Sequence, residues 1–339
     1  MKLYSAIDLH SNNNVLVVSD EKDRVVYEHR LPNDLKAVLK ELSPYRKNIQ
    51  AIAVESTYNW YWLVDGLMEA GYTVKLVNTM AVKTYDGLKY TGDEYDARHL
   101  SHLLRLGILP TGYIYPKEER KVRDLLRKRG HLVRQRTALL LSIQSHVSRH
   151  RGEGMTVSEI RKLDEPGLIR LYDRDALSKL SIRSQLTVIR CLDQEIETLE
   201  KTVLSQAKLK PAFEKILTMD GVGPILGMTI MYEMGSPERF TEVGHFSSYA
   251  RCVSSSRWSN GKKKGVGNRK NGNKYLAWAF VEAAHYAARF NDRIRRFYQR
   301  KKAKTNGAIA VKSVAHKLAR ACYYVIKDQV EFDADRAFA

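Results

Sequence analysis

This sequence has few cysteines, fewer acidic than basic residues and no long apolar run. Its three cysteines, Cys191, Cys252 and Cys322, are odd in number, far apart and form no CxxC pair, which argues against a disulfide framework and a zinc ribbon. The longest aliphatic run, residues 138–143, is far shorter than the roughly 20 residues that span a bilayer, and the N-terminus shows no apolar signal segment. We therefore expect a protein of the reducing cytoplasm that does not enter a membrane.

Positive charge is what the chain has in excess. Lys and Arg number 57 against 38 Asp and Glu, which gives a formal net charge of +19. Residues 251–320 hold 19 Lys and Arg but only two acids, Glu282 and Asp292. Because ordinary solvated faces mix both signs, this one-sided surface indicates a polyanionic partner, and nucleic acid is the leading candidate.

The first third of the chain predicts a mixed α/β sheet. Three β-rich runs separated by polar turns favour an antiparallel meander, after which helical and strand patterns alternate. The strands are expected at 2–10, 13–20, 25–31, 49–57 and 72–78, and the helices at 34–45 and 60–71, the second ending at Gly71. The order βββαβαβα predicts a sheet with helices on its faces.

Two long helices are expected in the middle of the chain, from Lys117 to about His150 and from Ser184 to about Lys208. In the second, apolar residues step by three and four as in a coiled coil, at Ile189, Leu192, Ile196, Leu199 and Val203. This seam is short enough to serve equally well in an intramolecular hairpin with the first helix. Residues 151–167 between the two helices predict a mobile connector.

Four acidic residues stand where a metal site would need them. Asp8 and Glu55 end predicted strands, while Asp93 and Asp96 lie three residues apart on one face of a nascent helix. Carboxylates gathered in this way repel one another unless a cation lies between them, and oxygen-only ligands suit Mg²⁺. Two such ions would hold a phosphodiester. Singly, each acid fits a helix cap or a surface charge, but together they predict a metal site.

Three segments around these acids carry a family resemblance: AIDLH at 6–10, AVEST at 53–57 and DEYDA at 93–97. They resemble the Asp-Glu-Asp-Asp set of the DEDD transposases of insertion sequences, bridge-RNA-guided recombinases related to the pilin-gene invertases. Residues 218–253 and 257–284 resemble the transposase domain of the same family. The resemblance covers nearly the whole chain and implies a ribonuclease-H-like N-terminal domain of the Holliday-junction-resolvase type.

The resemblance further implies that Asp8, Glu55, Asp93 and Asp96 are catalytic and that a serine of the C-terminal domain attacks a DNA phosphate. Ser259 matches that serine best, although many relatives have Ser directly before Gly and here Asn260 intervenes. Ser256 is the next candidate, with Ser254 and Ser255 close by. A serine hydroxyl needs nearby positive charge to act as a nucleophile, which the sequence offers at Arg257, Lys262, Lys263 and Lys264.

The partners implied by the resemblance are donor and target DNA, a structured non-coding RNA that pairs with both, and further copies of the chain. A homo-oligomer, either a dimer or a tetramer, would complete its active sites between protomers. The sequence shows neither the RNA nor the number of copies.

Further residues of the C-terminal half predict contacts to nucleic acid. The segment DGVGP at 220–224 lies between two apolar helices, a helix-hairpin-helix pattern in which Gly221 and Gly223 bring backbone N–H groups to a phosphate; a tight helix–helix turn is the alternative. Phosphate contacts are also expected at Arg269, Lys270 and Lys274, while Tyr275 and Trp278 fit base stacking and a core position about equally. His146 and His150 have zinc spacing but no third ligand nearby.

These observations divide the chain into a catalytic domain at 1–115, long linker helices at 116–208, a mainly α transposase domain at 209–330 and a tail at 331–339. The predicted function is serine recombination of DNA with Mg²⁺. One rival is a metal-only resolvase or nuclease in which water replaces the serine, and another is a non-catalytic nucleic-acid-binding protein on an old nuclease fold.

Overall fold

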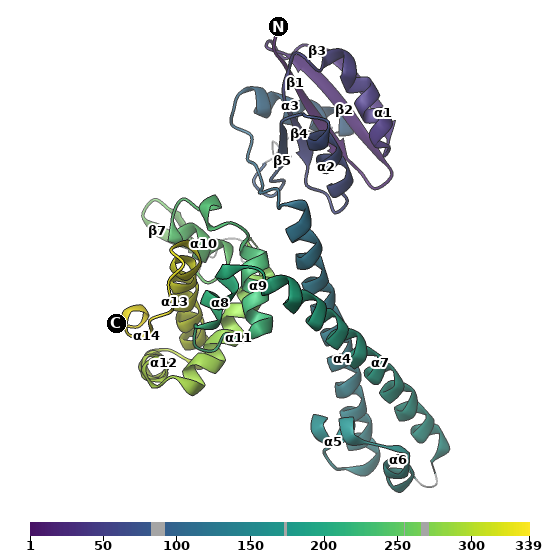
Figure 1. Cartoon of the computed structure of the whole chain (residues 1–339), viewed down its shortest axis with the longest axis vertical. Coiled ribbons are helices and arrows are strands. Elements are labelled where there is room, and N and C mark those ends of the chain that lie inside the picture. Colours follow the sequence, from purple (N-terminus) through teal and green to yellow (C-terminus); the bar gives the residue numbers. More distant parts are fainter. Residues whose placement is uncertain (83–91, 173–174, 254, 266–270) are drawn as a thin grey trace. The chain divides into compact units, whose positions relative to one another are not determined.

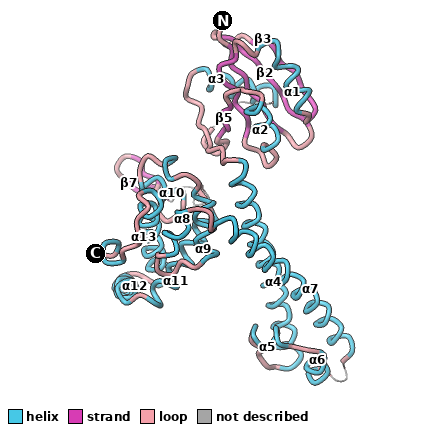
Figure 2. Tube along the Cα trace, in the orientation of Figure 1, coloured by secondary structure: helices cyan, strands magenta, loops and turns pink. Residues whose placement is uncertain are grey.

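The computed structural model describes residues 1–82, 92–172, 175–253, 255–265 and 271–339, and divides into two compact units, Met1–Lys117 and Glu118–Ala339. Figure 1 gives the course of the chain and Figure 2 its helices and strands. Among the described helices, none combines the length and apolar character needed to cross a membrane.

The N-terminal unit is built on a five-stranded mixed sheet. Its strands are β1 (Leu3–Leu9), β2 (Asn13–Asp20), β3 (Val25–Pro32), β4 (Ile49–Glu55) and β5 (Val74–Val77), in the order β3-β2-β1-β4-β5. β1 pairs antiparallel with β2 and β2 with β3, whereas β4 pairs parallel with β1 and β5. The predicted order of strands and helices is confirmed, and this sheet with flanking helices is consistent with the ribonuclease-H-like fold.

Helices cover both faces of this sheet. The alternation of side chains along β1 sends Leu3 and Ile7 to the face that α1 (Leu35–Leu42) and α2 (Tyr61–Glu69) cover, where Val38 and Leu63 join the same core. A short 3₁₀ helix, Ser43–Tyr45, follows α1. Ala6 faces the other way and packs with Leu100 of α3 (Asp93–Arg105). Asp8, two residues after Ala6, therefore lies on the α3 face.

The C-terminal unit begins with a helical hairpin of α4 (Lys117–Arg151) and α7 (Ala176–Ala207). Leu140 and Ile143 of α4 share one core with Ile182 and Ile189 of α7, and two ion pairs join the helices, Arg129 with Glu200 and Arg136 with Asp193. The apolar seam of the second long helix thus serves an intramolecular hairpin, one of the two predicted uses.

The segment between these helices is more ordered than predicted. Instead of a connector alone, it contains α5 (Val157–Lys162) and α6 (Glu165–Leu171), so this expectation was wrong. Thr156 and Glu159 form a capping box at the start of α5, and Ile160 and Leu168 are buried in the core of the hairpin. The capping box was visible in the sequence but was outweighed by the glycines around it.

The remainder of the C-terminal unit is a helical bundle around one large core. Its elements are α8 (Pro211–Leu217), α9 (Pro224–Met234), a 3₁₀ helix (Pro237–Arg239), α10 (Val243–Tyr249), β6 (Arg257–Ser259), β7 (Lys262–Gly265), α11 (Lys274–Phe290), α12 (Asp292–Lys304), α13 (Gly307–Lys327) and α14 (Ala334–Ala337). Residues 331–339, which were predicted to be a tail, include α14. Phe338, which follows α14, is 1% exposed and belongs to the core of the bundle.

Candidate functional site

Three of the four predicted carboxylates line one small cavity in the N-terminal unit. Asp8 near the end of β1, Glu55 at the end of β4 and Asp96 in the first turn of α3 surround a volume of about 120 Å³. Parallel pairing brings β1 and β4 side by side with Ile7 opposite Val54, so the ends of both strands reach the same place. Asp8 is 4% exposed, which is rare for a carboxylate unless it is paired.

Crowding changes the protonation of these carboxylates. Burial, a hydrogen bond with Asp8 and the negative charge of Asp8 and Asp96 together raise the pKa of Glu55 to about 8. Burial and the charges of Asp8 and Asp93 also raise the pKa of Asp96. At neutral pH Glu55 therefore holds a proton, as expected of a buried carboxyl group beside other carboxylates.

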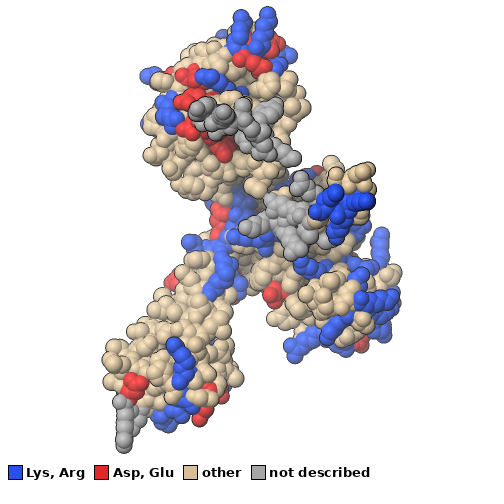
Figure 3. All heavy atoms as spheres, turned by 180° about the vertical axis from the view of Figure 1, so that it is seen from behind, with Lys and Arg blue, Asp and Glu red and all other residues tan. Residues whose placement is uncertain are grey.

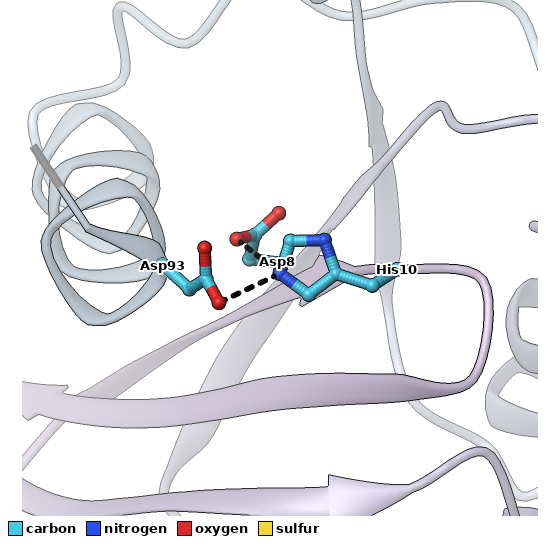
Figure 4. Close-up of side chains that lie close together, drawn as sticks. All are labelled: Asp8, His10 and Asp93. Carbon is cyan, nitrogen blue, oxygen red and sulfur yellow. Dashed lines mark ion pairs between the residues drawn. The ribbon is translucent and has the colours of Figure 1, made fainter.

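A histidine links Asp93 to Asp8. His10 Nε2 lies 3.3 Å from Asp8 Oδ2 and 3.2 Å from Asp93 Oδ2, between the two carboxylates (Figure 4). Arg30 of β3 donates to Asp93 Oδ2 at 2.6 Å. This hydrogen bond lowers the pKa of Asp93, and His10 adds to the effect. The structure thus brings together all four predicted acids, with Asp93 ion-paired and the other three around the cavity.

His10 and Arg30 were not predicted as site residues. The signal for His10 is its spacing, because a residue two positions after Asp8 in extended chain lies on the same face of the sheet. The backbone carbonyl of His10 accepts hydrogen bonds from the side-chain amides of Asn33 and Asn59, each at 3.0 Å. These two amides tie the loops after β3 and β4 to the histidine. Arg30 carried no signal, since its contact with Asp93 spans 63 residues.

The donor set fits a divalent cation. Ligand atoms of Asp8, His10 and Asp93 lie within 4.8 Å of one another, and Glu55 and Asp96 add carboxylate oxygens at the cavity. A cation bound among these carboxylates would offset their mutual repulsion. The oxygen donors suit Mg²⁺ and Mn²⁺, while the imidazole widens the choice of metal.

Ser259, the predicted nucleophile, stands on a β-hairpin of the C-terminal unit. It ends β6, and its pairing partner in β7 is Lys262. Asn260 and Gly261 form the turn with positive φ angles of 48° and 68°, the geometry of the Asn-Gly hairpin turn. The Asn-Gly dipeptide is the sequence signal for this hairpin. Asn260, which separates Ser259 from Gly261, is therefore a turn residue.

The surroundings of Ser259 are exposed and basic. Ser259, Lys262, Lys263 and Lys264 are all exposed, and Trp258 is 62% exposed. Within the described residues, the Ser259 hydroxyl has no hydrogen-bond partner. Arg257 belongs to β6, but its side chain is outside the part of the structure that is described.

The other candidate serines differ from Ser259 in their surroundings. Ser256 is exposed, and its Oγ accepts a hydrogen bond of 2.8 Å from Trp258 Nε1. The Oγ of Ser255 is buried and has no partner among the described residues. Ser254 lies outside the described residues. Ser259 is thus an exposed hydroxyl that engages no described group, in contrast to Ser256.

Gly221 and Gly223 of the predicted helix-hairpin-helix turn differ in how much space surrounds them. Gly221 has a φ of +79°, and a Cβ there would lie 2.3 Å from the carbonyl oxygen of Ala283 in α11, so packing of the turn against α11 by itself requires glycine. Gly223 precedes α9, and a Cβ there would meet nothing within 4 Å. A tight helix–helix turn, the alternative interpretation, accounts for Gly221.

A buried ion pair supports the start of α11. Glu233 of α9 is 1% exposed. Its carboxylate accepts two hydrogen bonds from Arg127 of α4, from Nε to Oε1 at 2.6 Å and from Nη2 to Oε2 at 2.7 Å. Burial is the largest single influence on Arg127 and lowers the pKa of its guanidinium, but the hydrogen bond to Glu233 and the nearby negative charge, chiefly that of Glu233, together outweigh it and raise the pKa. Asn273 donates to the same carboxylate at 2.7 Å and caps α11. No local sequence pattern predicts this network, because its members are far apart in the chain.

The other predicted contacts are divided between surface and core. Lys274 is exposed at the start of α11 and Trp278 is 41% exposed, whereas the ring of Tyr275 lies 4.7 Å below the guanidinium of Arg127. Arg269 and Lys270 lie outside the described residues.

The two histidines of α4 form no metal site within the described part of the chain. His146 and His150 stack at 4.3 Å, and His146 also contacts Tyr172.

Comparisons with known proteins match two parts of the chain to transposase models. Residues 6–151 match a family model described as Transposase, of the DEDD type of the IS110 group, and residues 213–299 match the model of the Transposase IS116/IS110/IS902 family. A probable family 20 transposase of Pseudomonas aeruginosa is 24% identical over 250 residues, which cover 70% of this chain and 71% of the relative. The transposase for insertion sequence element IS1111A of Coxiella burnetii is 23% identical over 238 residues, covering 67% and 62%.

Two separate parts of the chain thus match models of one transposase family. The buried carboxylates lie within the first match, and the buried Glu233 and the Ser259 hairpin lie within the second. A transposase acts on DNA, in keeping with the formal charge of +19. The chain belongs to the IS110 family of DEDD transposases.

Proposed function

We propose that this transposase is a serine recombinase that moves an insertion sequence, with its chemistry shared between a divalent-metal site and Ser259. The observation that carries the proposal is the buried carboxylate cluster, in which burial and the neighbouring carboxylates raise the pKa of Glu55 to about 8. An exposed serine with Lys262 directly across the hairpin supports the second half.

Asp8, Glu55, Asp93 and Asp96 would hold the metal, which we propose to be Mg²⁺, and His10, which lies between Asp8 and Asp93, would orient these two carboxylates. The bound ion would supply Lewis-acid stabilisation of charge on the scissile phosphate. Strand pairing of β1 and β4 keeps the ligands from spreading apart under their mutual repulsion. Arg30 neutralises Asp93 and so limits the charge that the cation must offset.

Ser259 would carry the covalent step. Its Oγ forms a bond to phosphorus while the bond from phosphorus to the bridging oxygen of the DNA strand breaks; the hydroxyl proton passes to solvent, and the leaving oxygen takes up a proton. A strand-end hydroxyl then attacks the phosphoserine in the reverse sense and is joined. The ammonium groups of Lys262, Lys263 and Lys264 would hold the neighbouring phosphates. Gly223, Lys274, Arg269 and Lys270 are further proposed contacts.

Guidance by a structured non-coding RNA, the bridge RNA, belongs to the same proposal, as does a homo-oligomer that completes its active sites between protomers. The excess of basic residues between 251 and 320 supports contact with a large polyanion. Because Asp8 and Ser259 belong to different compact units, pairing of units from two copies is one way to assemble the reaction.

The test is an adduct assay with Mg²⁺, the DNA end of the element and its flanking transcript. Protein–DNA complexes are digested and the modified peptide is mapped by mass. A DNA-linked peptide that contains Ser259 is the expected result. A link at Ser256 would move the nucleophile, and cut DNA with no linked peptide would favour the metal-only nuclease.

A further inference from the structure

The helix α12 carries a row of basic side chains that the proposed chemistry does not use. Among its 13 residues are seven Lys and Arg and one acid, Asp292. Arg296, Arg300 and Lys304 follow at intervals of four residues, so they lie on one face of the helix, about 6 Å apart along its axis. All three are exposed.

The opposite face of α12 fixes this row in place. Ile294 is fully buried in the core of the bundle, and Phe297 and Tyr298 pack against the same core. The side chain of Asn291 caps the helix by accepting from the backbone N–H of Ile294. Because its apolar stripe is anchored, α12 presents its basic face as a rigid ridge.

The charges of this ridge are not neutralised within the molecule. Arg293 pairs with Asp335 and Arg295 with Asp292, but none of Arg296, Arg300 and Lys304 has an acidic partner within the described residues. Figure 3 shows Lys and Arg side chains gathered on the lobe formed by the C-terminal helices. Unpaired cations in a row repel one another, so they lower the stability of the helix unless a polyanion binds them.

The helix dipole explains only part of this arrangement. Lys301, Lys302 and Lys304 lie in the last turn, where cations stabilise a helix by interacting with its carbonyl end. Arg296 and Arg300 stand earlier, beyond the range of that effect. Arginine also favours phosphate over water more strongly than lysine does, because its guanidinium is planar and weakly hydrated.

We propose that the α12 ridge, Arg296, Arg300 and Lys304, is a second surface for the DNA backbone, separate from the Ser259 hairpin. It would hold duplex DNA through phosphates alone, since a row of cations on one helix face positions a duplex without reading its sequence. The proposal rests on DNA as the substrate of the proposed function, and it assigns phosphate contacts to α12, whose residues 300–304 lie beyond the matched residues 213–299.

The test measures how binding of the full chain to a random-sequence DNA duplex depends on salt. The variant Arg296→Gln/Arg300→Gln/Lys304→Gln should lower the slope of log K against log salt by about 2 to 3, at roughly 0.9 for each lost phosphate contact. Glutamine keeps the helix propensity nearly unchanged. The single change Arg300→Gln should lower the slope by about 1 and guards against misfolding of the triple variant.

A matched control removes the same charge elsewhere. Lys36, Lys40 and Lys47 are exposed in the N-terminal unit and have no acidic partner among the described residues, so their triple change to Gln should leave the slope unchanged. Equal losses in both triple variants, or none in the α12 variant, would overturn the proposal. A loss seen with an RNA hairpin and not with the DNA duplex would also overturn it, because the surface would then belong to RNA.

Adduct formation at saturating DNA and low salt separates this inference from the proposed function. The α12 variant should still form the Ser259 adduct under those conditions. If the wild-type protein forms no adduct while its α12 variant shows the lower slope, the serine mechanism fails and the DNA surface stands.

Discussion

In the N-terminal unit, the candidate ligands lie on paired strands and on a helix packed against the same sheet, and they are buried enough to raise the pKa of Glu55 to about 8. In the C-terminal unit, Ser259 lies next to a two-residue turn, fully exposed and surrounded by lysines. A metal site needs ligands that cannot move apart, whereas a nucleophile that must reach a DNA backbone needs access. The two regions meet these opposite needs with a buried sheet and an exposed hairpin.

The largest effect is expected where the buried site is broken. Asp8→Asn should reduce strand cleavage by about 10³-fold or more, since metal stabilisation of a phosphate is worth several kcal/mol. DNA binding should stay within about twofold, because Asp8 is remote in sequence from the basic region 251–320.

Asp34→Asn is the matched control for that change. Asp34 caps α1 in the same unit, and asparagine caps a helix as well as aspartate does. Cleavage measured under single-turnover conditions should therefore stay at the wild-type level. Equal activity of the Asp8 and Asp34 variants would remove the metal site from the reaction.

The free energy of unfolding tests how closely the C-terminal unit is packed beneath its exposed hairpin. Gly221→Ala should destabilise that unit by about 2 to 4 kcal/mol, since the new Cβ would collide with the backbone of α11 and the φ angle is positive. Gly223→Ala, with open space around it, should change stability by less than about 0.5 kcal/mol. Thermal unfolding of the full chain measures both; similar losses would contradict the packing role of Gly221.

The exposed hairpin should respond to salt in a way that the buried site does not. Replacing Lys262, Lys263 and Lys264 together by Gln should lower the salt slope of DNA binding by up to about 3, at roughly 0.9 for each phosphate contact. The Lys36, Lys40 and Lys47 control serves here too. A slope that does not change would mean that the three lysines face solvent and touch no phosphate.

A smaller effect concerns the proton held by Glu55. Because its pKa in the folded protein is raised to about 8, the metal-free site binds a proton at pH 6 to 7 that Mg²⁺ must displace. Mg²⁺ affinity should therefore increase with pH and level off above about 8, with release of up to one proton. The sign follows from linkage, since the metal-free form binds more protons than the metal-bound form.

Calorimetric titration in two buffers of different ionisation enthalpy counts the released protons. Glu55→Gln should bind Mg²⁺ more weakly and lose this pH dependence between pH 6 and 8. If the variant kept the full proton release, the proton would belong to another group, such as Asp96.

Local patterns predicted the sheet and its acids well. The strand around Asp8 and the strand that ends at Glu55 alternate or run apolar as strands do, and parallel pairing places both strand ends together. Contacts between distant segments had no such signal. His10 lies between Asp8 and Asp93 because α3 packs against β1, and Arg30 reaches Asp93 from β3.

In the C-terminal unit, two features that were not predicted have clear local sequence patterns. The Asn260–Gly261 turn and the Thr156–Glu159 capping box are both sequence patterns, and each was hidden by a surrounding run of Gly, Ser or charged residues. Glu233, by contrast, looked like one acid in an apolar helix, and only the folded bundle shows that Arg127 and Asn273 satisfy it.

The sharing of the reaction between the two units is tested most directly with Ser259→Ala beside Asp8→Asn on the same end-labelled element DNA with Mg²⁺, with binding and cutting read separately. Both variants should bind DNA like the wild-type protein, and neither should cut it or form an adduct. Wild-type cutting by Ser259→Ala, with none by Asp8→Asn, would contradict the serine mechanism and leave a nuclease that works from its carboxylates alone.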